Sequence, residues 1–317
     1  MSMSVAPTIY AVGRLRNIRP KQAAELLGRV KSGFDYGVSD LNPPPEMKIE
    51  IAFTTDDFPG VVKEAQKLGL EIVAGTVTTP ERAETAKRHG IKTIVAPDLN
   101  EEVGAKALEL GLNYVPGIAW EQELKKLEDL VKQGKIQKPH LVKVFPFQGV
   151  RNAADLKKAL SGPFGEEIDN PPHGKTIIFF ESETFNSTFK PEYAKDEITF
   201  VHSPSDFSAA LRSSEIKLIV FGTPFGGHGI SSFNQLRGLV NEASPLKGIP
   251  FCAFGGVKLD DVAYLIQHGV SVIGTGSDLL GEKIVDAAAG GNFKPVDEKV
   301  DLLVKQVKLG REVPETA

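Results

Sequence analysis

Short apolar runs rich in Val and Ile alternate along the chain with longer segments of helical periodicity. The short runs predict strands over Thr8–Val12, Met47–Phe53, Glu71–Val77, Lys92–Ala96, Tyr114–Ile118, Leu141–Phe145, Ile249–Ala253 and Ser271–Gly274. The longer segments predict amphipathic helices over Pro59–Leu68, Pro80–His89, Glu101–Leu110, Glu121–Lys132, Asn152–Leu160 and Val296–Leu309. This alternation favours a closed (β/α)8 TIM barrel of parallel strands. An open doubly wound sheet is the alternative that spacing alone does not exclude.

Residues 165–248 interrupt the alternation of strands and helices between the sixth and seventh strands. The segment GEEIDNPPHGK marks the entry, because glycine, proline and acidic residues are typical of linkers. Three strand-like runs follow at Thr176–Phe180, Glu197–Val201 and Lys217–Phe221, with helical patterns at Ser205–Arg212 and Phe233–Val240. We therefore expect a small inserted α/β subdomain at 165–248, and a barrel domain built from residues 1–164 and 249–317.

Composition places the 317-residue chain among ordinary soluble proteins, with 41% hydrophobic and 25% charged residues. A net charge of -4 argues against a nucleic-acid partner. The single cysteine, Cys252, excludes an internal disulfide and fits a reducing compartment. No apolar run approaches the roughly 20 residues that span a bilayer, and no secretory signal pattern opens the sequence. We expect a cytoplasmic protein without a membrane partner.

Lys143 lies in the apolar run His140-Leu-Val-Lys-Val-Phe-Pro-Phe147. Burying an ammonium group costs free energy, and a buried lysine therefore usually has a lowered pKa. A lysine that is neutral near pH 7 is a nucleophile toward carbonyl groups. The alternative is an edge-strand lysine whose charge reaches solvent.

Glu50 is a second charge within an apolar strand, in Lys48-Ile-Glu-Ile-Ala-Phe53. Alone it would equally suit an outward-facing surface position. Two strands that each carry one ionisable residue in an apolar run instead suggest an inward pair. A carboxylate beside a desolvated amine can shuttle protons, which carbonyl chemistry requires.

Glycine-rich turns follow the last two barrel strands. Gly255-Gly256 comes before a helix that begins near Leu259, and Gly274-Thr-Gly-Ser277 follows the final strand. Backbone N–H groups in such turns can bind anions, and the seventh and eighth strands of barrels frequently carry a phosphate site. The six histidines show no HExxH spacing, and we expect no metal site and no cofactor.

Several stretches together carry a resemblance to a known family. They are IEIAF, AGTVTTPERAETAKRHGIKTIVAPDLNEE, LNYVPGIAW, VKVFPF, LSGPFG, FCAFGGVKLDDV and VIGTGSDLL. In this order the chain resembles the 2-keto-3-deoxy-6-phosphogluconate (KDPG) and 4-hydroxy-2-oxoglutarate aldolase family over roughly residues 47–164 and 249–280. Members of that family are class I aldolases on a (β/α)8 barrel and tend to be trimers, which implies a homo-oligomer here.

The resemblance implies a reaction and a role for each matching residue. The reaction is cleavage of a 2-keto-4-hydroxy acid, such as 2-keto-3-deoxy-6-phosphogluconate, to pyruvate and an aldehyde. Lys143 would be the Schiff-base lysine and Glu50 the acid/base carboxylate. The substrate contacts and the phosphate contacts would come from these residues: Thr76, Phe145 and Pro97 for the keto acid, and Gly255, Gly256 and Ser277 for the phosphate.

The chain departs from the family pattern in three places. Thr54 stands where the family has an arginine, which removes a two-pronged carboxylate ligand, and Arg14 is the candidate replacement. Ala253-Phe254 replaces a Pro-Thr pair, which deletes a hydroxyl group from the expected substrate pocket. Residues 165–248 stand where family members have only a short link.

Two other functions stay open at this stage. One is isomerase or epimerase chemistry on a sugar phosphate, and the other is a non-catalytic barrel that binds a ligand. The glycine-rich run Gly222-Thr-Pro-Phe-Gly-Gly-His-Gly229 lacks the GxxxxGK[ST] pattern of a nucleotide-binding loop. We interpret it as a surface loop in which His228 is solvated.

Overall fold

A computed structural model describes residues 6–118, 121–145, 175–179, 198–201, 216–221 and 230–312. The chain divides into two compact units, one of residues 1–147 with 233–317 and the other of residues 148–232. Among the helices of the described ranges, none combines the length and apolar character that crossing a bilayer requires.

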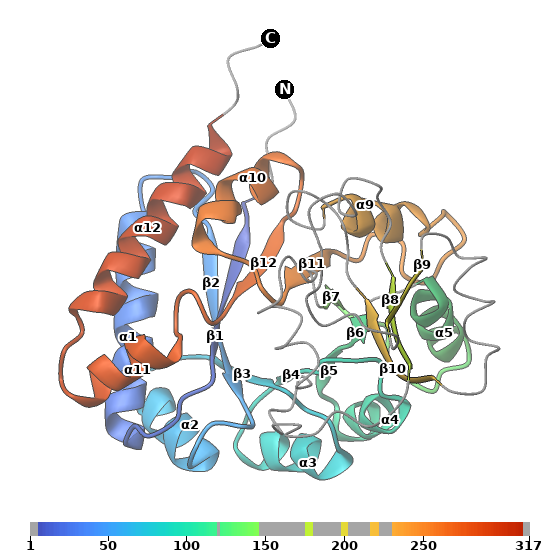
Figure 1. The fold of residues 1–317 in the computed structure, drawn as a ribbon. Helices are drawn as coiled ribbons and strands as arrows, with labels where there is room; N and C mark the ends of the chain where they lie inside the picture. The colour runs from blue at the N-terminus through green and yellow to red at the C-terminus, as the bar shows by residue number, and fades with distance from the viewer. Residues whose placement is uncertain are drawn as a thin grey trace. The chain divides into compact units, whose positions relative to one another are not determined.

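The first unit is a closed barrel of parallel strands. These strands are β1 (Thr8–Gly13), β2 (Glu46–Ala52), β3 (Ile72–Gly75), β4 (Thr93–Val95), β5 (Asn113–Val115), β6 (Gly117–Ile118), β7 (Val142–Val144), β11 (Phe251–Phe254) and β12 (Val272–Thr275). Their order in the sheet is β5-β4-β3-β2-β1-β12-β11-β7-β6. Only Pro116 separates β5 from β6, and its carbonyl accepts a bond from the Lys143 N–H at 2.9 Å. The two segments therefore act as one bent strand that closes the ring, and the (β/α)8 barrel is confirmed (Figure 1).

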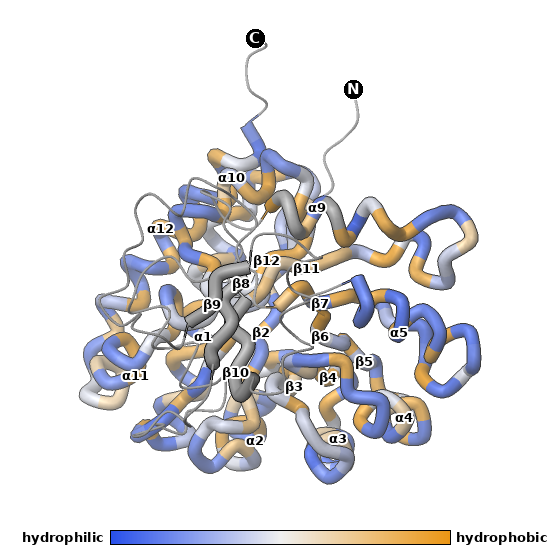
Figure 2. Tube along the Cα trace, turned by 45° about the vertical axis from the view of Figure 1, so that its right-hand side comes forward, coloured by the Kyte–Doolittle hydropathy of each residue, from blue (hydrophilic) through white to orange (hydrophobic). Residues whose placement is uncertain are grey.

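Helices cover the outside of the barrel. They are α1 (Pro20–Gly37), α2 (Phe58–Lys67), α3 (Pro80–Arg88), α4 (Glu101–Leu110), α5 (Glu121–Lys132), α9 (Ile230–Gly238), the 3₁₀ turn η1 (Leu259–Asp261), α10 (Val262–Gln267), α11 (Glu282–Ala289) and α12 (Lys294–Arg311). α1 packs against α2 and α12, and α3 packs against α4. Hydrophilic and hydrophobic residues alternate along α4 and α5 in Figure 2, as expected for helices with one face on the barrel.

Local sequence signals explain where several helices begin. The side chains of Thr79 and Asn100 accept hydrogen bonds from the N–H groups of Arg82 and Val103, which caps α3 and α4. Pro80 follows Thr79 at the first position of α3, where its missing N–H costs nothing. The cap residue of α3, Thr79, comes only four residues after the end of β3.

The barrel interior holds a cluster of apolar side chains from all around the ring. They are Tyr10, Val73, Val95, Val115, Leu141, Cys252, Phe254 and Val272. The ring of Tyr10 meets that of Phe254 edge to face, with centroids 5.3 Å apart. Because parallel strands alternate their side chains between the two faces, Glu50 and Lys143 follow this layer on the same inward face.

The second unit contains three parallel strands in the order β10-β8-β9. They are β8 (Lys175–Phe179), β9 (Ile198–Val201) and β10 (Ile216–Phe221), each within one residue of a predicted strand. The predicted helices over 152–160 and 205–212 and the glycine-rich loop 222–229 lie outside the described residues. In α9, Phe233 is buried and its ring lies 6.5 Å from that of Phe251, so this part of α9 packs on the barrel.

Candidate active site

Lys143 is the middle residue of β7 and is 6% exposed. Two aromatic rings surround its ammonium group: Nζ lies 4.4 Å from the ring centroid of Phe145 and 5.1 Å from that of Phe254. The two rings give the lysine an aromatic environment.

Glu50 lies on β2 and is 2% exposed. Its Oε2 atom has no hydrogen-bond partner among the described residues. Gly75 makes room for the carboxylate, because a Cβ atom at that position would lie 2.2 Å from Glu50 Oε1. A buried carboxylate oxygen without a hydrogen-bond partner lowers the stability of the fold, and such groups are characteristic of functional sites.

Each of these two residues acts on the protonation of the other. Burial lowers the pKa of Lys143 below its usual value, and the charge of Glu50 opposes that shift. Burial raises the pKa of Glu50 above its usual value, and Lys143 opposes that shift. In both cases desolvation is the larger cause, so burial shifts each group toward its neutral form. A neutral amine is a nucleophile, and a carboxyl group beside it can exchange protons.

The strand end beside Glu50 carries Thr76, whose φ of 57° lies in the left-handed region. Its carbonyl accepts a hydrogen bond from Nη1 of Arg82 at 2.9 Å, and the same nitrogen donates to Oγ1 of Thr78 at 2.7 Å. The guanidinium group of Arg82 also lies 5.7 Å from the ring centroid of Phe53. Arg82 thus brings a partly buried cation to the carboxyl ends of β2 and β3.

The other predicted keto-acid contacts are distributed around the same end of the barrel. Phe145 and Pro97 are half-buried, at the carboxyl ends of β7 and β4. Arg14 is exposed after β1, and the charged residues that influence its pKa are Arg16, Glu282 and Asp56. Its role as a carboxylate ligand stays a prediction.

The candidate phosphate loops follow β11 and β12. Gly255 and Gly256 have φ values of 88° and 76°, which glycine adopts without strain. Ser277 is exposed in the turn after β12. The three residues therefore lie in the two loops at the carboxyl ends of neighbouring strands, where a shared anion could contact both.

Asp278 ties these two loops together. Its Oδ2 accepts a bond from the Leu259 N–H at 2.8 Å, and its Oδ1 pairs with Lys299 Nζ at 2.5 Å. Burial acts to raise the pKa of Asp278, but the contacts with Lys299 and Leu259 outweigh it and lower the pKa. The ionised carboxylate thus fixes the loop of Ser277 against the one that follows Gly256.

The described residues contain no group of three or more His, Cys, Asp or Glu side chains that could hold a metal ion. Cys252 is buried on β11, and burial raises the pKa of its thiol far above the usual value. A protonated thiol is a poor nucleophile and a poor metal ligand. Among the described groups, Lys143 and Glu50 are therefore the candidates for chemistry at this site.

Residues 46–175 match the sequence model of KDPG and KHG aldolases. The match includes both Glu50 and Lys143. Over these residues the barrel is similar to the KDPG and KHG aldolase family.

A curated relative is similar in sequence to part of the chain, and two solved structures share its fold. The relative is a 2-dehydro-3-deoxy-6-phosphogalactonate aldolase of Escherichia coli K12, 33% identical over 106 residues, which are 33% of this chain and 47% of the relative. The chain thus spans about half the length of this curated relative. A native KDPGal structure covers 96% of both chains with 17% identity and a TM-score of 0.54. A 4-hydroxy-2-oxoglutarate/2-dehydro-3-deoxyphosphogluconate aldolase from TTHB1 covers 94% of both chains with 18% identity and a TM-score of 0.51.

The sequence reasoning missed two residues of this site, Arg82 and Asp278. Arg82 is the third residue of a capped helix and looks like an ordinary exposed arginine in the sequence. The one signal in the sequence is the capping residue Thr79, which follows the predicted third strand closely. It indicates that the first turn of α3 lies near the carboxyl ends of the barrel strands. Asp278 follows Ser277 directly, and an acidic residue there gives no sign that its partners are Leu259 and Lys299.

Proposed function

We propose that the protein is a class I aldolase that cleaves a 2-keto-4-hydroxy acid to pyruvate and an aldehyde. One observation carries the proposal. Glu50 and Lys143, from strands on different sides of the ring, are both buried in the barrel, and burial shifts both toward their neutral forms. A neutral amine can attack a ketone directly, whereas an ammonium group cannot.

The proposed reaction begins when the Nζ lone pair of Lys143 attacks the C2 carbonyl carbon. The protonated carboxyl group of Glu50 then gives its proton to the carbinolamine hydroxyl, which leaves as water and produces an iminium ion. The resulting carboxylate takes the proton of the C4 hydroxyl, directly or through water. The electrons of the C3–C4 bond pass to the iminium nitrogen, so the aldehyde leaves and an enamine of pyruvate remains. Glu50 returns the proton to C3, and water releases pyruvate from the lysine.

The loops after β11 and β12 support a phosphorylated substrate. Consecutive glycines with positive φ present backbone N–H groups, and the Ser277 hydroxyl adds a donor on the neighbouring loop. Within this proposal Gly255, Gly256 and Ser277 contact the phosphate, and Asp278 positions their loops.

Arg82 supports recognition of the substrate carboxylate. A guanidinium group binds carboxylates with two parallel hydrogen bonds, and Thr54 cannot. Only Nη1 of Arg82 has partners among the described residues, which leaves donors for a ligand. Thr76 and Phe145 complete the keto-acid contacts, and Pro97 lines the pocket.

A coupled assay tests the proposal. Wild-type protein is mixed with 2-keto-3-deoxy-6-phosphogluconate, and pyruvate is followed through lactate dehydrogenase and NADH. We expect pyruvate release from the wild type and from Lys48→Met, a second lysine on the barrel strands, and none above background from Lys143→Met. An isomerase, an epimerase or a ligand-binding barrel would release no pyruvate from any 2-keto-4-hydroxy acid, and that result would refute the proposal.

A further inference from the structure

A cavity of about 380 Å³ opens at the amino ends of the barrel strands. Polar residues at or next to the strand starts surround it, among them Thr8, Glu46, Glu71 and Asn113. Its lining also includes Lys48 and Leu141, which come two residues before Glu50 and Lys143 on the same strands. Two residues along a strand cover roughly 7 Å, so these two lining residues lie on the amino side of Glu50 and Lys143.

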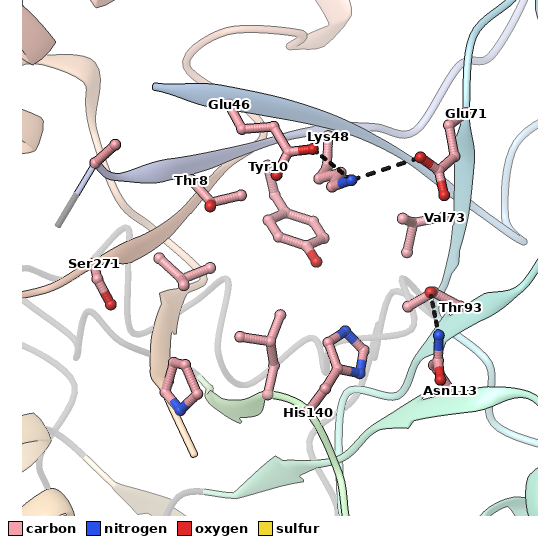
Figure 3. Close-up of a pocket in the computed structure, with 14 residues that line it drawn as sticks. Thr8, Tyr10, Glu46, Lys48, Glu71, Val73, Thr93, Asn113, His140 and Ser271 are labelled. Carbon is pink, nitrogen blue, oxygen red and sulfur yellow. Dashed lines mark hydrogen bonds and ion pairs between the residues drawn. The ribbon is translucent and has the colours of Figure 1, made fainter. Parts of the chain in front are cut away.

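Tyr10 of β1 points into this cavity (Figure 3). The residue is 3% exposed, and its hydroxyl group lies on the side of the ring that faces the cavity. Buried tyrosine hydroxyls usually have a partner, because an unpaired buried polar group costs free energy. The hydroxyl is therefore presented to whatever occupies the cavity. The ring of Tyr10 packs edge to face with the ring of Phe254, and this contact restricts rotation of the Tyr10 side chain.

The charges around the cavity are largely paired with one another. Lys48 Nζ lies 2.6 Å from Glu46 Oε1 and 3.6 Å from Glu71 Oε2. Burial lowers the pKa of His140, and the charge of Lys48 lowers it further, which keeps the imidazole neutral at pH 7. Two carboxylates against one ammonium leave a formal charge of -1, which repels anions and offers no free cation to bind them.

The uncharged groups are those that recognise hydroxyl-bearing molecules. Tyr10, Thr8 and Ser271 contribute hydroxyls, and neutral His140 contributes one donor and one acceptor. Val73 and Val272 provide apolar walls against which carbon–hydrogen surfaces pack. The volume lies within the range of roughly 300–1,000 Å³ that is typical of small-molecule sites.

We propose that this cavity binds an uncharged polyhydroxy compound of monosaccharide size, with one ligand hydroxyl bonded to Tyr10. The site is independent of the aldolase proposal, because none of its lining residues takes part in that chemistry.

The test uses the full chain labelled with fluorotyrosine and observed by ¹⁹F NMR. The chain has five tyrosines, and the resonance that disappears in Tyr10→Phe belongs to Tyr10. D-Glucose and D-sorbitol are titrated as uncharged probes, with D-gluconate and inorganic phosphate as anionic comparators. We expect a saturable shift of the Tyr10 resonance with at least one uncharged probe, and binding of both anions at least about tenfold weaker.

Calorimetry on variants completes the test. Tyr10→Phe keeps the ring and its contact with Phe254, and it should weaken binding of the responsive probe about 3- to 10-fold, the value of one hydrogen bond. Tyr36→Phe, at a tyrosine that is 85% exposed, and Lys143→Met should leave the affinity unchanged. Absence of a saturable shift with both uncharged probes, equal affinity for the anions, or unchanged affinity of Tyr10→Phe would each overturn the proposal.

Discussion

The proposed catalytic pair is the part of the site that single residues reveal most directly. Lys143 and Glu50 are charges in apolar strands, and the desolvation cost that makes them conspicuous in the sequence is also what shifts their pKa values in the barrel. The aromatic enclosure by Phe145 and Phe254 could not be read from the sequence. It depends on Gly274 of the neighbouring strand, where a Cβ atom would lie 2.4 Å from the Phe254 ring.

Replacing Glu50 by glutamine should shift the pH dependence of Lys143. The carboxylate charge raises the pKa of the lysine, so its loss should lower that pKa further. Schiff-base formation with pyruvate rises with pH as the amine loses its proton, and its acid limb should therefore move to lower pH. Rates of trapping with cyanoborohydride across the pH range measure this limb. Glu46→Gln, an exposed glutamate on the same strand, serves as control, and a shift to higher pH in Glu50→Gln would contradict the assignment.

Arg82 should determine affinity for the keto acid rather than the rate of the chemical step. Losing a charged two-pronged contact costs about 1.5–3 kcal/mol, and Arg82→Gln should therefore raise KM about 10- to 100-fold with kcat little changed. Arg82→Lys keeps the charge and should recover only part of this loss. Arg88→Gln, on the same helix, is the matched control. Equal KM values for Arg82→Gln and Arg88→Gln would exclude the carboxylate role.

At the level of elements, the close approach of β3 to Glu50 depends on Gly75. In Gly75→Ala the new methyl group would collide with Glu50 Oε1, and we expect displacement of the carboxylate and about 100-fold lower kcat. The free energy of unfolding should fall by about 1–3 kcal/mol, as for other overpacked cores.

A second glycine supplies the control for that variant. Gly28 is in the middle of α1, where a Cβ atom would make an ordinary contact of 3.6 Å with Leu68. Gly28→Ala should raise the free energy of unfolding by about 0.5–1 kcal/mol without changing kcat. Denaturant unfolding and steady-state kinetics measure both quantities. A fully active Gly75→Ala would show that the position of Glu50 does not matter.

The loops after β11 and β12 should lose their alignment when Asp278 is removed. Asp278→Ala breaks the contacts with Leu259 and Lys299, and KM for the phosphorylated substrate should rise about tenfold. Lys299→Met removes only the ion pair and should have a smaller effect in the same direction. The dephosphorylated substrate is the comparison, because its KM should not change. Equal losses for both substrates would separate Asp278 from phosphate binding.

The sequence predicted strands better than helices. Each predicted strand is present, because β-branched residues and buried periodicity signal strands locally. The fifth is divided at Pro116, whose missing N–H cannot join the ladder. The helices α1 and α11 were not named in advance. α1 begins without a side-chain cap and has no acidic residue in its first turn, so Pro20 is the one start signal that its sequence offers.

For the whole molecule, the barrel architecture was predicted from eight strands that alternate with helical segments, and the sheet order confirms it. Closure of the ring could not be deduced from spacing, since an open sheet has the same pattern. It depends on the bent strand β5–β6, which pairs with β4 on one side and β7 on the other. The contacts of Asp278 with Leu259 and Lys299 likewise join segments about 20 residues apart in the sequence, which the pairing of β11 with β12 brings together.

Reduction with borohydride in the presence of pyruvate tests the central claim most directly. The account predicts a stable adduct with the mass of a reduced pyruvyl group on the wild-type chain, located on Lys143 by peptide mapping. It predicts the same adduct on Lys48→Met and none on Lys143→Met. Absence of the adduct from the wild type, or its persistence in Lys143→Met, would contradict the assignment of Lys143 as the Schiff-base residue.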